Sequence, residues 1–175
     1  MKIYEAKNHI LINTDDISPS QHRHMAAHII VSLDNKIEIK LENERYYDYG
    51  VLIPAGKLHK VYTDDNKVLV FLYDCSTNVA KQIKNVQTIP EEICKSIARL
   101  YSDLEKDINS NNYYRFEMEC LSLLGINYSG KNENDDRINS AITYIRQSMY
   151  EKISCGEIAK KVFLSQSRFS HLFKE

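Results

Sequence analysis

The sequence predicts an α+β protein, in which an N-terminal β-barrel or jelly roll is followed by an α-helical hairpin and a small three-helix unit. Short segments rich in Val, Ile, Leu and Tyr alternate with turn residues over the first 76 residues, as they do in barrels and double-sheet jelly rolls. Beyond that point the apolar residues recur at helical spacing. We therefore expect four segments: the barrel at 1–76, the helical hairpin at 77–126, a polar linker at 127–136 and the helical unit at 137–175.

The composition is that of a globular protein in a reducing compartment. The chain has 175 residues, of which 43% are hydrophobic and 27% charged. No apolar run approaches the roughly 20 residues of a membrane span, and the N-terminus lacks the apolar core of a secretory signal. Four scattered cysteines (75, 94, 120 and 155) form no C-x-x-C pair, which argues against a thiolate zinc site and a disulfide framework. We therefore expect a cytoplasmic protein without a membrane partner.

The first segment predicts several short strands. Ile37, Ile39 and Leu41 alternate with charged residues, the pattern of a strand with one buried face. Turn residues such as Pro54–Gly56 and Asp64–Asn66 separate the apolar stretches. The predicted strands are His28–Ser32, Lys36–Leu41, Val51–Ile53, His59–Tyr62 and Val68–Tyr73.

Two helices are expected to follow and to form an antiparallel hairpin. The first begins after Pro90, and the second ends at Gly125. The apolar stripe of this hairpin either forms a dimer interface or packs on the barrel of its own subunit. The candidate dimerisation residues are Ile93, Ile97, Leu100, Leu104, Ile108, Met118, Leu121 and Leu124.

The tail predicts three short helices with defined ends. Ile138, Ile142, Ile145 and Met149 form the apolar stripe of the first helix. Ser154 and Glu157 have the spacing of a capping box that opens a second helix. Ser165 is a predicted N-cap for a third helix, which buries Phe169, Leu172 and Phe173. Its other face carries the polar residues Gln166, Ser167, Arg168, Ser170, His171 and Lys174.

A short helix, a tight turn and a helix with a polar outer face are typical of a helix-turn-helix. Charge supports this interpretation. Residues 137–174 contain seven Lys or Arg against two Glu, a net charge of +5, whereas the whole chain carries −1 and the remainder therefore −6. A basic end on an acidic chain is expected where that end contacts phosphate.

The tail closely resembles the first helix-turn-helix of AraC-type transcriptional regulators. The match begins at Ile138 and includes S-x-x-E-I-A-x-x-V-x-L-S-x-S-x-F-S-x-L-F-K from Ser154 to Lys174. The DNA-binding domain of that family has two such motifs joined by a long helix. This sequence stops at Glu175, where that helix begins in the family, so we expect only the first motif. The resemblance also implies that the paired helices after the barrel dimerise.

Histidines are concentrated in the predicted barrel. His22, His24 and His28 share one face of an extended segment by parity, and His59 ends a G-x3-P-x-G-x2-H run. The two spacings resemble the motifs with which cupin barrels hold one divalent metal, commonly with a carboxylate at the position of His28. Imidazole suits zinc, nickel, iron or copper. The alternative is a metal-free effector pocket lined by the four histidines, with Tyr46, Tyr47, Tyr49 and Tyr62 as further effector-binding candidates.

These patterns together predict an effector-responsive, homodimeric AraC-type transcription regulator that binds double-stranded DNA and is not an enzyme. Gln166, Ser167, Ser170 and His171 are the candidates for base edges, while Arg168 and Lys174 suit phosphates, with Lys160 and Lys161 as additional backbone contacts. Two other functions stay open: a metal-dependent cupin enzyme (a dioxygenase or isomerase), and a ligand-binding dimerisation module without DNA function. No acid or base candidate is spaced to point to the pocket, which counts against the enzyme.

Overall fold

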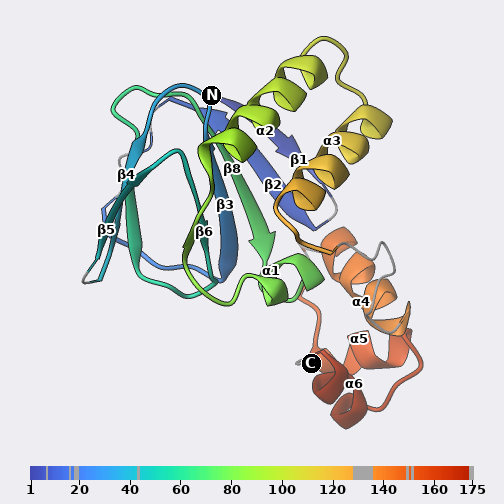
Figure 1. Ribbon diagram of the computed structural model, residues 1–175. Helices are drawn as coiled ribbons and strands as arrows, with labels where there is room; N and C mark the ends of the chain where they lie inside the picture. Colours follow the sequence, from blue (N-terminus) through green and yellow to red (C-terminus); the bar gives the residue numbers. More distant parts are fainter. Residues whose placement is uncertain are drawn as a thin grey trace. The chain divides into compact units, whose positions relative to one another are not determined.

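The computed structural model describes residues 1–6, 8–15, 17, 20–42, 44–127, 136–148, 150 and 152–173, with Arg146 described by its backbone alone. The chain divides into two compact units, Met1–Tyr128 and Ser129–Glu175 (Figure 1). Most of the predicted linker, Met149 and Lys174 lie outside the described residues. None of the described helices is long and apolar enough to cross a membrane.

Unit 1 contains two antiparallel sheets. The larger sheet has the strand order β1-β2-β8-β3-β6-β9 and the smaller one the order β5-β4-β7. The strands therefore form two separate sheets and not one closed barrel. Their bounds are β1 Lys2–Glu5, β2 His9–Thr14, β3 Ala26–Ser32, β4 Ile37–Leu41, β5 Arg45–Asp48, β6 Gly50–Ile53, β7 His59–Tyr62, β8 Val68–Asp74 and β9 Gln87–Thr88.

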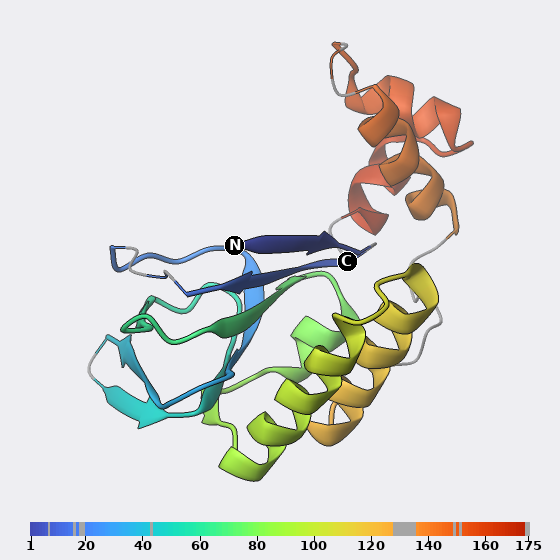
Figure 2. The same ribbon diagram turned by 90° about the horizontal axis from the view of Figure 1, so that it is seen from above.

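Side-chain alternation builds two cores around the larger sheet. On β3, Ala27, Ile29 and Val31 face the helices, whereas Ile30 packs between the sheets with residues of β4 and β7. Successive side chains of a strand point to opposite faces, so one strand serves both cores. The result is three layers, in which helices cover one face of the larger sheet and the smaller sheet covers the other (Figure 2).

The helical hairpin consists of α2, Glu91–Leu104, and α3, Ser110–Leu123, and a short helix α1, Asn78–Gln82, precedes it. Asn109 caps α3 by accepting the backbone N–H groups of Asn111 and Asn112. Gly50 brings the sheet close to α2, because a Cβ at this position would lie 2.9 Å from Cys94 Sγ and 2.8 Å from the Ile30 carbonyl oxygen. The hairpin buries Cys94, Ile97, Tyr101, Leu104, Phe116, Cys120 and Leu121 against the sheet.

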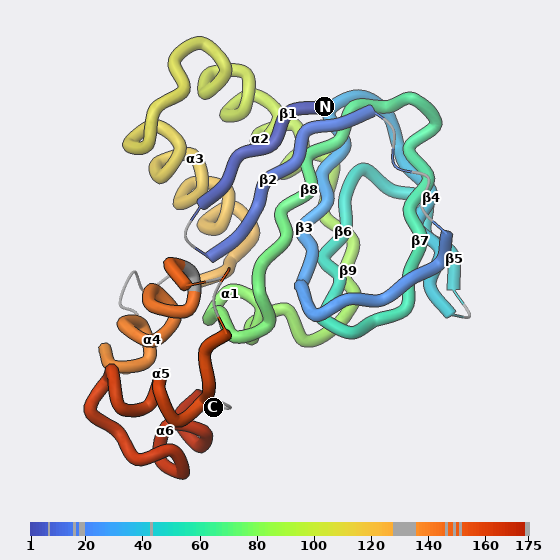
Figure 3. The backbone as a smooth tube through the Cα atoms, turned by 180° about the vertical axis from the view of Figure 1, so that it is seen from behind, coloured from blue at the N-terminus to red at the C-terminus, as the bar shows by residue number. Residues whose placement is uncertain are grey.

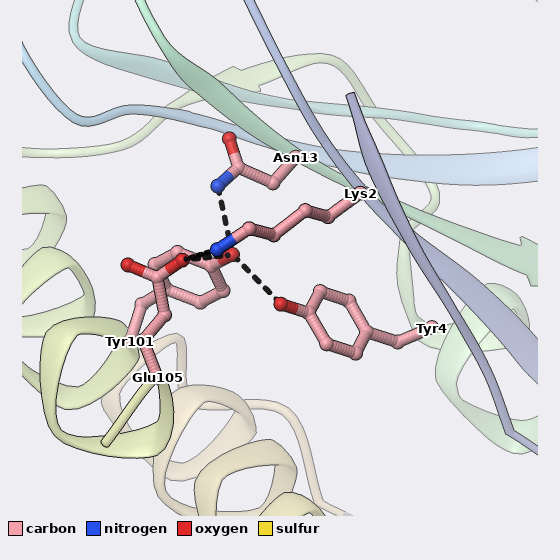
Figure 4. A network of polar contacts seen from close by, with 5 residues as sticks. All are labelled: Lys2, Tyr4, Asn13, Tyr101 and Glu105. Carbon is pink, nitrogen blue, oxygen red and sulfur yellow. Dashed lines mark hydrogen bonds and ion pairs between the residues drawn. The ribbon is translucent and has the colours of Figure 1, made fainter. Parts of the chain in front are cut away.

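A polar network fastens α2 to the edge of the sheet (Figure 4). The hydroxyl of Tyr101 accepts a 2.7 Å hydrogen bond from Asn13 Nδ2 on β2 and lies 3.1 Å from the hydroxyl of Tyr4 on β1. It also donates to Glu105 Oε1, which lies 2.6 Å from Lys2 Nζ. The first two strands and the hairpin are thus held together by hydrogen bonds as well as by apolar packing.

Unit 2 is a three-helix unit made of α4, Asp136–Gln147, α5, Cys155–Lys161, and α6, Gln166–Leu172. The predicted capping box is confirmed: Ser154 Oγ accepts the Glu157 N–H at 3.2 Å and Glu157 Oε2 accepts the Ser154 N–H at 2.7 Å. The predicted N-cap Ser165 is confirmed as well, since its hydroxyl accepts the Arg168 N–H. The apolar core of the unit is Ile138, Ala141, Ile158, Ala159, Val162 and Phe169.

The turn between α5 and α6 is a Schellman motif. Leu164 N–H donates to the carbonyl of Ala159 and Phe163 N–H to that of Lys160, the pair of hydrogen bonds that defines this helix ending. Phe163 occupies its left-handed position with φ 58° and is 94% exposed. The turn ends α5 sharply, and α6 begins after only Val162 to Ser165.

Candidate functional site

The four histidines of unit 1 are brought together by backbone pairing. His22 and His59 exchange both backbone hydrogen bonds, at 3.0 and 2.9 Å, and such a pair places its side chains next to each other on one face. The carbonyl of His24 accepts from the N–H of Gly56, whose φ of 75° favours glycine. His28 follows on β3 and shares the face of Ile30 between the sheets.

The imidazole rings form one cluster. The ring centres of His24 and His28 lie 4.3 Å apart, and those of His28 and His59 4.6 Å. His22 lies 4.7 Å from His59 and 5.1 Å from His24. One ring nitrogen from each of His22, His24 and His59 lies within 4.8 Å of the others. The structure thus brings together all four predicted histidines, three of them in a ligand-like arrangement.

Backbone carbonyls orient two of the rings. His22 Nδ1 lies 2.8 Å from the Ser20 carbonyl oxygen, and His59 Nδ1 lies 2.8 Å from that of Lys57. A carbonyl can only accept, so both rings carry their proton on Nδ1, and the lone pair of each Nε2 stays available. Metal-ligating histidines are commonly held in this way by a hydrogen bond from the other nitrogen.

His28 is held differently. Its Nε2 lies 2.9 Å from His24 Nε2, and its buried Nδ1 has no hydrogen-bond partner among the described residues. Burial lowers the pKa of His28 to about 2, and burial is also the main cause of the lowered pKa of His24 and of His59. The lowered pKa values favour the neutral form of these three imidazoles at neutral pH, and the neutral form is the one that ligates metals. Neutral imidazole donors with an unsatisfied buried nitrogen fit zinc, nickel, iron or copper.

The four tyrosines are not gathered at the histidines. Tyr46 is half-buried against the core between the sheets, and its hydroxyl donates to Glu44. Tyr47 and Tyr62 both lie opposite Glu38 on the outer face of the smaller sheet. Tyr49 packs on the core beneath the helices. Among the four, only Tyr46 shares the side of its sheet that faces the histidines.

The predicted dimerisation stripe is divided between two environments. Ile97, Leu104 and Leu121 are buried in the core of their own subunit, so packing on the subunit itself, the alternative left open above, accounts for them. Ile108 lies beyond α2 and is 48% exposed. The half-buried remainder is Ile93, Leu100, Met118 and Leu124.

The polar face of α6 is open to solvent. Gln166, Ser167, Arg168 and His171 are exposed, while Phe169 on the opposite face is buried. Ser170 is half-buried, and its hydroxyl lies 3.5 Å from Cys155 Sγ at the start of α5. Lys160 is exposed, and Lys161 Nζ lies 5.4 Å from the centre of the Tyr144 ring. The helix presents the predicted residues together, apart from Lys174, which lies outside the described ones.

A buried polar cluster beneath α3 was not predicted from the sequence. His9 Nδ1 lies 3.4 Å from Glu117 Oε1, which accepts a 3.0 Å hydrogen bond from the Tyr73 hydroxyl. His9 Nε2 lies 2.7 Å from the Tyr113 hydroxyl. Burial lowers the pKa of His9 to about 4 and raises the pKa of Glu117. The predicted apolar stripe of this helix consists of Met118, Leu121 and Leu124 and does not include Glu117.

His9 makes the stability of unit 1 depend on pH. The unfolded chain binds a proton at His9 near pH 6.5 and the folded one only near pH 4, so folding becomes less favourable as the pH falls from about 6.5 towards 4. At pH 5 this effect lowers the free energy of unfolding, relative to neutral pH, by on the order of 2 kcal/mol. Urea unfolding of the wild type and of His9→Gln at pH 7.5 and 5 measures it. The wild type should lose more stability than the variant, and equal losses would refute the assignment.

Comparison with known proteins places the fold. No family model matches the chain, and no curated protein matches it by sequence. The chain is similar to the crystal structure of the AraC-like transcriptional activator CuxR, with a TM-score of 0.53 and 8% identity, covering 98% of this chain and 72% of that one. At this identity the likeness shows a shared fold. The fold of the chain therefore resembles that of an AraC-like regulator.

Two further solved structures are also similar. ToxT from Vibrio cholerae O395 matches with a TM-score of 0.47 and 8% identity over 95% of this chain and 72% of that one. The conserved SPY1581 protein of unknown function from Streptococcus pyogenes matches 42% of this chain and 70% of its own, with a TM-score of 0.35 and 16% identity.

Proposed function

We propose that this chain is a DNA-binding transcription regulator of AraC type, in which unit 1 senses a metal ion and unit 2 contacts double-stranded DNA. The observation that carries the proposal is the α5–α6 pair: a capped helix, a Schellman turn and a second helix with a buried apolar face and an exposed polar one. The shared fold with an AraC-like transcriptional activator supports it.

In this proposal α6 enters the major groove with its first turn against the bases. In a helix-turn-helix the N-terminal residues of the second helix contact base edges. Gln166 and Ser167 occupy that turn, and a glutamine amide can pair with adenine through two hydrogen bonds. Arg168 stands beside them with an exposed guanidinium, which suits a phosphate.

The test compares two variants of α6. Gln166→Ala should relax the preference at one base pair of a selected duplex, at a cost of about 1–3 kcal/mol on that sequence. Arg168→Ala should weaken binding to all duplexes alike and lower the slope of log K against log salt by about 1. Fluorescence anisotropy with selected and scrambled duplexes over a salt series separates the two effects. The same loss with Lys84→Ala, an exposed lysine of unit 1, would count against α6.

The proposed effector is a divalent transition metal. His22, His24 and His59 would hold it, because their nitrogens lie together and carbonyls already orient two of the rings. When bound, the metal supplies a Lewis-acid centre that can accept a further small donor molecule. The ligands come from the segment before β3 and from the start of β7, so occupancy would join the two sheets. In the same proposal the paired sheets are a cupin-type jelly roll.

The chain is further proposed to act as a homodimer. The parts of the predicted stripe that remain accessible are the half-buried Ile93, Leu100, Met118 and Leu124 and the exposed Ile108. Pairing through them would leave both cores of unit 1 intact.

A metal-dependent cupin enzyme is the second candidate, and the ligand-like histidines favour it. An open coordination position is also what catalytic metal sites use. A screen for substrate turnover by the metal-loaded protein separates the two functions. Turnover that is abolished in His59→Gln would support the enzyme.

A further inference from the structure

The outer face of the smaller sheet carries three cations in one row across its strands. Arg45 on β5 lies opposite Lys40 on β4, and Lys40 lies opposite Lys60 on β7. Neighbouring strands are about 4.8 Å apart, so the row is roughly 10 Å long. Like charges directly opposite each other destabilise a sheet, and sheets more often pair opposite charges at such positions. The three cations therefore do not stabilise the sheet, and we look for their role in binding.

Among the described residues, few groups balance the charge of this row. Glu38 lies 3.4 Å from Arg45, and Lys60 Nζ stacks 4.2 Å from the centre of the Tyr62 ring. Lys40 forms no ion pair with any described residue. The face thus keeps a net charge of +2, although residues 1–136 together carry −5. A surface with this local positive charge attracts a negatively charged partner.

A second row, two residues along the strands, is aromatic. Tyr47, Glu38 and Tyr62 lie opposite one another across the same three strands, and the backbone positions of the two rows are roughly 7 Å apart. Tyr47 is 65% exposed. Within the described part of unit 1 no helix covers this face, since α2 and α3 lie beyond the larger sheet (Figure 3).

We propose that this face binds single-stranded nucleic acid. The phosphates would lie along the cation row, and bases would stack on the two tyrosines, as in proteins that combine a basic track with aromatic platforms. Charge and flat apolar surface occupy separate rows here, as they occupy separate parts of a nucleotide. In an acidic polysaccharide both belong to one sugar ring, and an acidic peptide offers no base to stack. The site is independent of α6 and of duplex binding.

The test measures binding of the full chain to a labelled oligothymidylate by anisotropy over a salt series. Lys40→Gln/Lys60→Gln should bind at least tenfold more weakly, and its slope of log K against log salt should fall by about 1.4, because two phosphate contacts are lost. Lys81→Gln/Lys84→Gln removes the same charge elsewhere on unit 1 and should bind like the wild type. Since the first variant relieves repulsion, its thermal midpoint should not fall.

Aromatic stacking is tested separately. Tyr47→Ala should weaken binding about fivefold or more, whereas Tyr47→Phe should keep it. Arg168→Ala should weaken duplex binding and leave oligothymidylate binding unchanged. Failure of the single-strand proposal can therefore be distinguished from failure of the proposed α6 contacts. Equal losses in the two lysine pairs, or binding of heparin or polyglutamate as tight as that of the oligothymidylate, would overturn the proposal.

Discussion

Replacing Phe169 by Ala is expected to unfold unit 2 and abolish duplex binding. Phe169 is 4% exposed and joins α6 to the cluster formed by Ile158, Ala159 and Val162. Removing a buried phenyl ring costs about 3–5 kcal/mol, and a unit of this size has little more stability than that. Amide hydrogen exchange should show loss of protection in α4–α6 while unit 1 keeps its own.

Phe173→Ala is the matched control. The two rings lie 5.1 Å apart, but Phe173 is 46% exposed, so its removal should cost less than half as much and leave α5 and α6 protected. If Phe169→Ala binds duplex DNA as the wild type does, α6 is not the helix that positions the contacts.

The second large effect is expected at the histidines. The wild type should bind one zinc or nickel ion per chain, and His59→Gln should weaken that binding by at least about 100-fold, since it loses a ligand together with its orienting hydrogen bond to Lys57. Metal in hundredfold excess over its Kd should raise the stability of unit 1 by about 2.7 kcal/mol. Isothermal titration and thermal unfolding measure the two quantities.

His171→Gln controls for histidine loss outside the cluster, because His171 lies on α6. It should bind metal as the wild type does. An unchanged melting profile of the wild type with zinc, nickel, iron and copper would contradict the metal site and leave the histidines as the lining of an effector pocket.

Features that depend on a few neighbouring residues can be predicted from the sequence. The capping box of Ser154 and Glu157 and the cap by Ser165 act over three residues, so the residue types alone predict them. The start of α2 after Pro90 is equally local. The histidine cluster was predicted because parity and spacing within short segments place these side chains on one face.

Features that depend on contacts between residues far apart in the sequence were not predicted. The predicted strands do not include β5, because this short segment becomes a strand only through its pairing with β4. The burial of Glu117 on α3 was not predicted, because its partners Tyr73 and His9 lie on strands that are distant in the sequence. The cation row depends on the register of three strands, which one sequence does not reveal.

The most direct measurement is the affinity of the full chain for a selected duplex, with and without bound zinc. If unit 1 senses a metal that governs DNA contact by unit 2, the affinity of the wild type should change by at least about fivefold on metal binding, and that of His59→Gln should not change. Equal affinities of the wild type in both states, or no retention of duplex in either, would contradict a metal-responsive regulator.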